Sequence, residues 1–245
     1  MRNILLVFGY DGTDFCGWAA QPGKASIQAA MEQAVAAVVG TKVNVEPSGR
    51  TDAGVHALGH AASFQTESSI PCDNLVKAIN THLPRSIRVY SAEEREAAFH
   101  ARFSARAKTY RYRIYRRPIC PPDLWRYVHH FRHPLDVDEM KTAAMAFEGL
   151  HDFTSFTSPE ELPKGSAERM IHSSRIEEIG NELHYMVRGS GFLHHMVRNI
   201  VGTLLEVGKG NWRAADIARI LAARDRTQAG PTPPAKGLWL VEVEY

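Results

Sequence analysis

The sequence has little cysteine and no long hydrophobic run. Its three cysteines, Cys16, Cys72 and Cys120, are odd in number and lie far apart, so neither a disulfide framework nor a zinc site is indicated. No apolar run approaches the roughly 20 residues that span a bilayer. The apolar start, residues 1–9, is too short for a signal peptide and is typical of a buried strand. We therefore expect a cytoplasmic protein without membrane contact.

Metal-binding patterns are incomplete, although the chain has 12 histidines. His56 and His60 have the i, i+4 spacing of a zinc-binding helix, but the glutamate base is missing and Gly59 weakens a helix. Two further clusters offer no third ligand in a known pattern: His129, His130 and His133, and His194 with His195. We expect no metal and no other cofactor, and a metal-dependent hydrolase remains an alternative.

Charge is unevenly placed along a chain of ordinary globular composition. Hydrophobic residues make up 44% and charged residues 23%, and the net charge is only +2. Residues 85–132, however, hold 12 Lys and Arg against 4 Asp and Glu, so the rest of the chain is net acidic. This asymmetry is typical of a protein that presents a basic face to a polyanion. A solvated, arginine-rich loop is the alternative.

Hydrophobic periodicity predicts a first α/β half over residues 1–105. It starts with a strand to about Phe8 and a helix capped by Ser26 and ended by Gly40. A short strand around 43–45, broken by Pro47, precedes a strand at 61–65. A helix that begins at Pro71 then leads to a strand at 87–90. This order of elements is that of a split β-α-β sheet of the ferredoxin-like kind.

A second half of the same kind is predicted over residues 106–245. Alternation predicts a strand at 109–115, and Asp136 with Glu139 forms a capping box that opens a helix. A hairpin follows over 175–188, turning at Gly180-Asn181. A long helix is predicted from about 192 to 207, ended by Gly208, then a short helix around 217–221 and a buried strand at 238–243. The fold class is therefore α+β.

The loop at residues 48–56 carries the strongest candidate for chemistry. Gly49 and Gly54 bracket a tight turn that holds Arg50 and Asp52 two residues apart. A nearby cation favours the ionised form of an aspartate, and an ionised carboxylate can act as a nucleophile. On chemistry alone, a structural turn in which Asp52 caps the next segment is the stronger interpretation.

The run Gly-Arg-Thr-Asp-Ala-Gly-Val-His-Ala at residues 49–57 resembles the signature loop of the tRNA pseudouridine synthase A family. The resemblance extends over nearly the whole chain. Its further motifs are Tyr10-Asp11-Gly12-Thr13, Gly17-Trp18, Phe99-His100-Ala101-Arg102-Phe103-Ser104-Ala105, Lys108-Thr109-Tyr110-Arg111-Tyr112, His151-Asp152-Phe153-Thr154-Ser155-Phe156, residues 194–202, residues 229–232 and Gly237-Leu238. Ala19-Ala20 departs from the glutamine and polar residue that usually follow the tryptophan in that family.

The resemblance implies an isomerase that converts uridine to pseudouridine in the anticodon arm of tRNA, usually at uridines 38 to 40. The fold it implies has two ferredoxin-like halves, joined through largely antiparallel sheets, with the active cleft between them. A homodimer is also implied. The target base must leave its stack to react. No atoms are gained or lost, so no redox cofactor is needed.

Residue by residue, the resemblance makes Asp52 the nucleophile and Tyr110 the active-site tyrosine, with Arg50 as the cation beside Asp52. Attack at C1′ of the ribose and attack at C6 of uracil are both open. Spacing alone cannot separate Tyr110 from Tyr112. Arg198 resembles a basic residue of the family, although its helical position alone favours a solvated charge. Leu205 resembles a pocket residue of the family, although its helical position alone favours a core side chain.

RNA binding is predicted for the stretch from Arg102 to Arg117, which has interleaved tyrosines and no acidic residue. The candidate contacts to tRNA are Arg102, Arg106, Lys108, Arg111 and Arg113. Alternation places Tyr110, Tyr112 and Ile114 on one strand face, opposite Arg111 and Arg113. A non-catalytic RNA-binding module is the alternative, but mere binding gains nothing from a carboxylate that faces phosphates.

Overall fold

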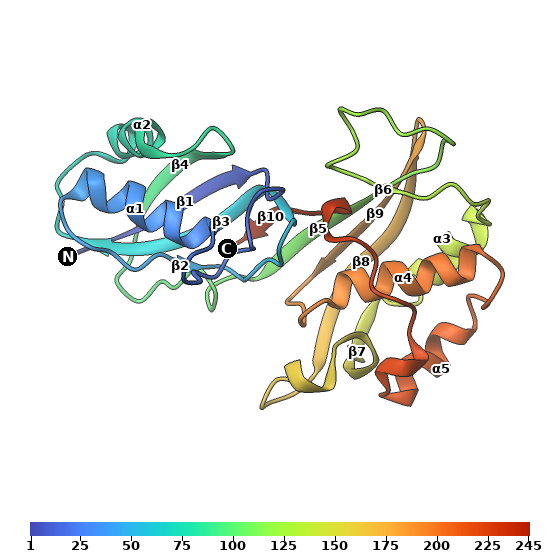
Figure 1. The fold of residues 1–245 in the computed structure, drawn as a ribbon. Coiled ribbons are helices and arrows are strands. Elements are labelled where there is room, and N and C mark those ends of the chain that lie inside the picture. The colour runs from blue at the N-terminus through green and yellow to red at the C-terminus, as the bar shows by residue number, and fades with distance from the viewer. The chain divides into compact units, whose positions relative to one another are not determined.

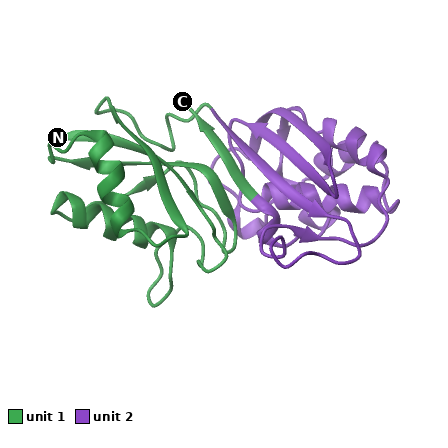
Figure 2. Cartoon of the chain, turned by 90° about the horizontal axis from the view of Figure 1, so that it is seen from above, with its two compact units in different colours: residues 1–106, 239–245 green, residues 107–238 purple.

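The computed structural model describes all 245 residues and divides them into two compact units (Figure 2). Unit 1 consists of Met1–Arg106 and Trp239–Tyr245, and unit 2 of Ala107–Leu238. The predicted second half, 106–245, differs from unit 2 at the end of the chain. Trp239 and Leu240 pair in parallel with His56 and Ala57 of unit 1, which brings the last residues into that unit. No helix has the length and apolar character to cross a membrane.

Unit 1 has the predicted order strand, helix, strand, strand, helix, strand (Figure 1). Its elements are β1 (Arg2–Tyr10), α1 (Ile27–Val39), β2 (Glu46–Pro47), β3 (His56–Thr66), α2 (Cys72–His82), β4 (Ile87–Arg95) and most of β10 (Leu238–Glu244). β1 lies between β3 and β4 and is antiparallel to both. β2 pairs antiparallel with β3, and α1 and α2 pack against each other. This is the sheet order of a split β-α-β unit.

Helix α1 begins and ends where the sequence predicts, and α2 begins at Cys72, one residue after the predicted Pro71. The Ser26 hydroxyl accepts a hydrogen bond from the backbone N–H of Ala29 (3.3 Å), and Gly40 ends α1 with a φ of 77°. The strand predicted at 43–45 is displaced, because the ladder to β3 starts only at Glu46. Pro47 lies within that ladder instead of breaking it, since an edge strand tolerates proline.

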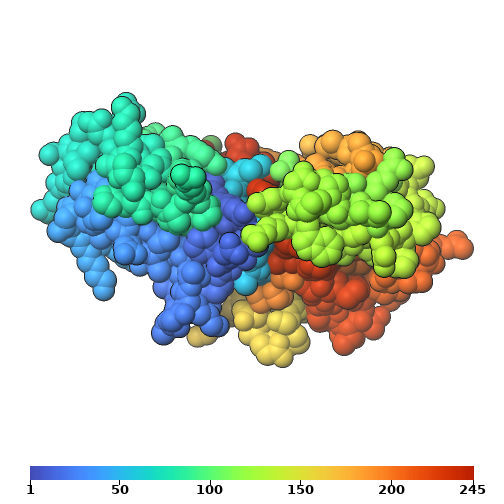
Figure 3. Space-filling model, turned by 45° about the horizontal axis from the view of Figure 1, so that its top comes forward, coloured from blue at the N-terminus to red at the C-terminus, as the bar shows by residue number.

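Unit 2 repeats the order strand, helix, strand, strand, helix through β5, α3, β8, β9 and α4. Its elements are β5 (Ala107–Tyr115), β6 (His129–His130), α3 (Val137–Met145), β7 (Gly149–Asp152), β8 (Glu168–Ile179), β9 (Glu182–Gly189), α4 (Met196–Gly208) and α5 (Asp216–Ala223). β9 lies between β5 and β8, antiparallel to both, and β7 continues the sheet beyond β8. The segment between β5 and α3, green in Figure 3, forms part of the surface of unit 2.

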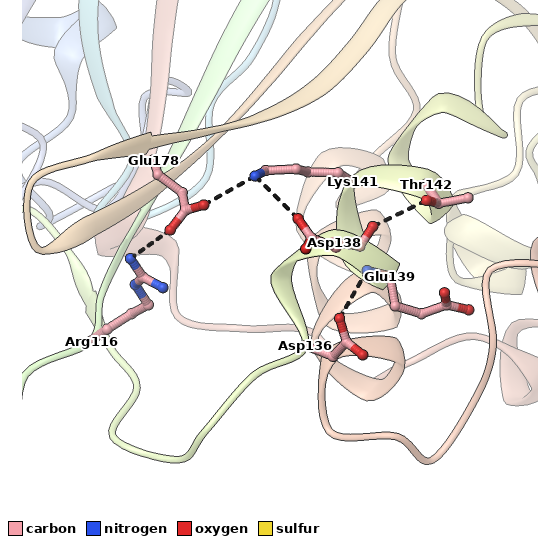
Figure 4. Close-up of polar contacts among 7 residues, drawn as sticks. All are labelled: Arg116, Asp136, Asp138, Glu139, Lys141, Thr142 and Glu178. Carbon is pink, nitrogen blue, oxygen red and sulfur yellow. Dashed lines mark hydrogen bonds and ion pairs between the residues drawn. The ribbon is translucent and has the colours of Figure 1, made fainter.

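Two predictions for unit 2 need correction. α4 begins at Met196 and not near residue 192, because His195 at its N-cap has a left-handed φ of 57°. The capping box of α3 is only half formed (Figure 4). Asp136 accepts from the N–H of Glu139 (3.0 Å), but the Glu139 carboxylate accepts from the distant N–H of Ala214 (2.7 Å). The hairpin turn at Gly180-Asn181 is confirmed.

The last strand, β10, is also less buried than predicted. Only Leu238 and Leu240 are buried in it, and the residues that follow are partly or fully exposed. Glu242 lies on the same strand face as Leu238 and Leu240 and is exposed, whereas Val243 on the other face packs against a buried cluster, so neither face of β10 is buried along its whole length.

The N-cap of α3 provides a test of this part of the fold. We expect Asp136→Ala to lower the free energy of unfolding by about 1 kcal/mol, because an N–H of the first turn loses its acceptor. Asp138→Ala is the matched control, since the side chain of Asp138 is 95% exposed and forms an ion pair with Lys141 at 3.5 Å. Urea denaturation measures both variants. An equal or larger loss for Asp138→Ala would contradict the assignment of the cap.

Candidate active site

The Asp52 loop is a short irregular connection between β2 and β3. At its start, the N–H of Ser48 donates to the carbonyl of Ala61 (2.8 Å). At its end, the N–H of Val55 donates to the carbonyl of Asp52 (3.2 Å), and Gly54 closes this turn with a φ of 77°. Gly49, the other predicted bracket, needs no positive φ. Because a strand follows the loop and not a helix, Asp52 does not cap a helix.

The first loop of the chain packs directly against the backbone of the Asp52 loop. The N–H of Trp18 donates to the carbonyl of Thr51 (3.0 Å). A Cβ atom on Gly17 would lie 2.7 Å from that carbonyl oxygen, and Gly17 has a φ of 100°. Glycine is therefore required where the two backbones meet.

A buried polar contact fixes the residue beside Asp52. The Tyr10 hydroxyl is hydrogen-bonded to Oγ1 of Thr51 (2.8 Å) and to Nδ1 of His60 (3.1 Å). All three side chains are buried. The His60 ring also packs on Phe8 and Trp18, with ring centroids 5.1 and 4.7 Å away. Thr51 is thus held by its main chain and by its side chain.

His56 performs a similar role at the other end of the loop. Its Nδ1 lies 3.1 Å from the N–H of Gly12 and 3.2 Å from the Asp11 carboxylate, and its ring stacks on Trp239 at 4.4 Å. His56 and His60 both lie on strand β3 and are fully buried. The helical spacing considered for a metal site therefore does not apply to them.

The two candidate catalytic side chains of this loop reach the surface from a fixed base. Asp52 is half-buried and Arg50 is exposed. Thr51, directly before Asp52, and Val55, three residues after it, are buried. The loop can therefore present a carboxylate to a ligand while its backbone stays in place.

The two tyrosines on β5 in unit 2 have different surroundings. Tyr110 is 8% exposed, and its ring lies edge-on to Phe192 at 5.0 Å. Tyr112 is 0% exposed, and its hydroxyl donates to the carbonyl of Pro234 (2.7 Å). Burial raises the pKa of the Tyr112 hydroxyl above its ordinary value. The predicted shared face is confirmed, since Tyr110, Tyr112 and Ile114 are all buried.

The predicted site residues of α4 take up two different environments within unit 2. Arg198 is half-buried, and its Nε donates to the carbonyl of Pro233 (2.9 Å). This bond ties the start of α4 to the proline-rich segment near residue 233. Leu205 is 5% exposed and lies among the buried residues of the helix.

Several of the predicted RNA-binding cations have partners inside unit 2. Arg113 makes two hydrogen bonds of 2.7 Å to the Glu182 carboxylate. Arg116 pairs with Glu178 (3.1 Å), which Lys141 also contacts (3.0 Å; Figure 4). These cations therefore stabilise the end of the β8–β9 hairpin.

The remaining cations differ in their exposure. Arg102 and Arg106 are exposed and form no ion pair, whereas Lys108 and Arg111 are half-exposed. Burial, and then the charge of neighbouring Arg113, lowers the pKa of Arg111.

Sequence reasoning missed the residues that hold the Asp52 loop. Tyr10 and Trp18 belong to motifs that carry the family resemblance, but no pattern indicated that they contact residue 51. His60 offered no signal beyond its spacing from His56. These contacts join residues 41 and 50 positions apart in the chain, beyond the reach of local periodicity.

The fold and the site define an α+β protein with a firmly held carboxylate loop and a basic strand that carries tyrosines. The profile of a family described as tRNA pseudouridine synthase matches residues 6–104 and 143–245. The chain therefore belongs to the tRNA pseudouridine synthase family, whose members are isomerases that act on tRNA.

Individual relatives agree over their full length. The chain is 50% identical over 247 residues to a protein named tRNA pseudouridine synthase A from Solibacter usitatus, covering 100% of both chains. It is 46% identical over 245 residues to a protein of the same name from Brevibacillus brevis, and 42% identical over 245 residues to another from Caldicellulosiruptor saccharolyticus. Coverage is again 100% of each chain.

A double-mutant cycle tests the contact that holds the loop. We expect Tyr10→Phe and Thr51→Val each to lower the free energy of unfolding by about 1–2 kcal/mol, because each removes one partner of a buried hydrogen bond. The double variant should cost less than the sum of the two, since both changes remove the same bond. Tyr90→Phe, on an exposed ring, is the control. Strictly additive losses in urea denaturation would show that the bond contributes nothing.

Proposed function

We propose that the chain isomerises uridine to pseudouridine in the anticodon stem-loop of tRNA, at positions 38 to 40. One observation carries the proposal: a half-buried aspartate, Asp52, on a loop whose neighbouring residues are held by buried contacts. The relatives named tRNA pseudouridine synthase A support it, because they match this chain from end to end.

The reaction exchanges one glycosidic bond for another. The bond between C1′ and N1 of uracil breaks, the base turns, and a bond between C1′ and C5 forms. N1 gains a proton and the C5 proton leaves to solvent, so atoms and electrons balance without a cofactor. In the proposal the base first leaves its stack. The Asp52 carboxylate then acts as the nucleophile, either at C1′ of the ribose or at C6 of the uracil.

Arg50 and Tyr110 have supporting roles in the proposal. Arg50 is exposed and lies two residues from Asp52 in the sequence, and the proposal assigns it as the cation for the carboxylate. Tyr110 is assigned to the uracil because Tyr112 is fully committed to the core of unit 2, with no exposed surface and a hydroxyl bonded to Pro234. The proposal assigns Asp52 of unit 1 and Tyr110 of unit 2 to the same uridine, as the family resemblance implies for a fold with one active cleft.

The setting of the enzyme is also proposed. Arg198 and Leu205 are assigned to substrate binding by resemblance, and Arg102, Arg106, Lys108, Arg111 and Arg113 to tRNA. We further propose a cytoplasmic homodimer, in which two-fold pairing extends the basic surface offered to one tRNA. Light scattering that returned the mass of a single chain, 27.3 kDa, at micromolar concentration would contradict the dimer.

Tritium release tests the proposed function. An unmodified tRNA transcript labelled with tritium at C5 of uracil should lose its label to water when the protein is added, because the C5 proton leaves in the reaction. A matched transcript with cytidine at positions 38 to 40 should retain its label. Retention of the label by the uridine-containing tRNA, at the level of a reaction without enzyme, would overturn the proposal in favour of an RNA-binding protein without activity.

The role of Asp52 is tested by Asp52→Asn. We expect turnover to fall more than a thousandfold, on the order of the loss at other essential nucleophiles, while tRNA affinity stays within about threefold. The amide keeps the size of the carboxylate and loses its charge. Asp73→Asn, an exposed residue in the first turn of α2, is the matched control and should keep full activity. A residual rate of one tenth or more in Asp52→Asn would exclude Asp52 as the nucleophile.

The choice between the two tyrosines is tested by Tyr110→Ala and Tyr112→Phe. Tyr110→Ala should lower kcat far more than tRNA affinity, with an unchanged salt dependence, because it removes a ring that contacts the uracil. Tyr112→Phe should keep kcat and lower the free energy of unfolding by about 1 kcal/mol, since it loses one buried hydrogen bond. Loss of kcat in Tyr112→Phe with a normal Tyr110→Ala would require the pocket tyrosine to be reassigned.

A further inference from the structure

Phe103 has the most exposed aromatic ring of the chain. Its side chain is 76% exposed, compared with 58% for Tyr90 and 52% for Trp125. Covering an apolar ring with another surface is favourable, because it removes apolar area from water. Phe103 belongs to the motif at residues 99–105, to which the proposed reaction assigns only Arg102.

The turn that carries Phe103 is closed by its own hydrogen bonds. The N–H of Ser104 donates to the carbonyl of His100 (2.9 Å), and the N–H of His100 donates to the Ser104 hydroxyl (3.1 Å). The N–H of Arg102 donates to Nδ1 of His100 (3.0 Å). The first two bonds span Phe103, and the third holds the backbone of Arg102 directly before it.

The turn is also fixed to the core of unit 1. Ala101 is fully buried; its N–H donates to the Ser63 hydroxyl (3.2 Å) and its carbonyl accepts from the Tyr245 hydroxyl (2.8 Å). The Asn3 side chain donates to the carbonyl of Phe99 (2.8 Å). Phe103 is therefore an exposed ring on a rigid support, which loses little conformational entropy when a ligand covers it.

Two cations flank the ring in the sequence and remain available. The guanidinium of Arg102 lies 5.6 Å from the centroid of the Phe103 ring. The His100 ring packs against the Phe103 ring, with 4.5 Å between the two ring centroids. Arg102 and Arg106 are exposed and form no ion pair. An exposed ring beside an unpaired arginine can take a base on its π face and a phosphate on its cation.

We propose that Phe103 and Arg102 form a stacking subsite for one unpaired nucleobase of the bound tRNA, with the Phe103 ring against the base and the Arg102 guanidinium on its phosphate. The subsite rests on the proposed function only for the identity of the ligand. It positions the RNA and takes no part in bond making or breaking.

Equilibrium binding of full-length protein to an unmodified tRNA transcript tests this subsite, with each variant also carrying Asp52→Asn so that the substrate is not consumed. Phe103→Ala should bind roughly 5- to 150-fold more weakly, the range measured for a lost base–aromatic stack, with an unchanged salt slope. Phe103→Tyr and Phe103→Trp should retain affinity, whereas Phe103→Leu, which is apolar without a π face, should fail as Phe103→Ala does. Arg102→Ala should reduce the salt slope by about one unit.

The matched control is Tyr90→Ala, another exposed ring of unit 1. Its neighbour Arg88 is occupied by the backbone carbonyls of Pro84 and Ile87, so this variant should bind tRNA normally. Full rescue by Phe103→Leu, or unchanged affinity in Phe103→Ala, would overturn the subsite. So would a Phe103→Ala protein that becomes monomeric while binding tRNA normally, because the ring would then serve contact between copies. Tritium release by the Phe103→Ala protein that keeps Asp52 tests the proposed function separately, because that assay measures the reaction and not the affinity for tRNA.

Discussion

The hydrogen bonds of the Tyr10 hydroxyl to Thr51 and His60 hold the Asp52 loop of unit 1 in place. A buried polar group left without a partner costs about 1–3 kcal/mol, so these three side chains keep one another in place. They lie on β1, on the Asp52 loop and on β3 respectively. A loop with no regular structure of its own thereby gains a fixed attachment one residue before Asp52. A site on a scaffold-held loop of this kind combines exposure with precise placement.

Side chains of the same type have different roles in this protein, as the tyrosines of β5 and the arginines show. Tyr112 completes the core and satisfies the carbonyl of Pro234, while Tyr110, two residues earlier on the same face, keeps some exposure. Among the cations, Arg113 is paired with Glu182 in a two-bond contact that links β5 to β9. Arg102 and Arg106 in unit 1 make no such pair. The amino-acid composition does not distinguish these arginines, whereas the structure shows which of them form an ion pair.

Local patterns predict much of the fold because they depend on neighbours in the chain. Ser26 and Gly40 bound α1 as caps do, and the stripe of Ile217, Ile220 and Leu221 is the buried face of α5. β6 and β7 went unpredicted because segments of two and four residues show no periodicity. The start of α4 depends on the backbone angle of His195, which its sequence does not indicate.

The remaining differences come from contacts between distant segments. The Glu139 carboxylate accepts a hydrogen bond from the N–H of Ala214, 75 residues away, and does not complete the cap of its own helix. The place of Trp239 in unit 1 is decided by pairing with His56. The motif at residues 49–57 indicated the candidate catalytic loop through resemblance, but the side chains that hold this loop, Tyr10 and His60, required the structure.

We propose that the held loop presents Asp52 as a nucleophile. The most direct measurement is a covalent trap, in which the protein reacts with tRNA containing 5-fluorouridine and the adduct is mapped by mass spectrometry after digestion. Fluorine replaces the C5 proton and cannot leave as that proton does, so we expect an RNA-derived mass on the peptide that contains Asp52 and none in Asp52→Asn. An adduct on any other peptide, or an equal yield from Asp52→Asn, would contradict it.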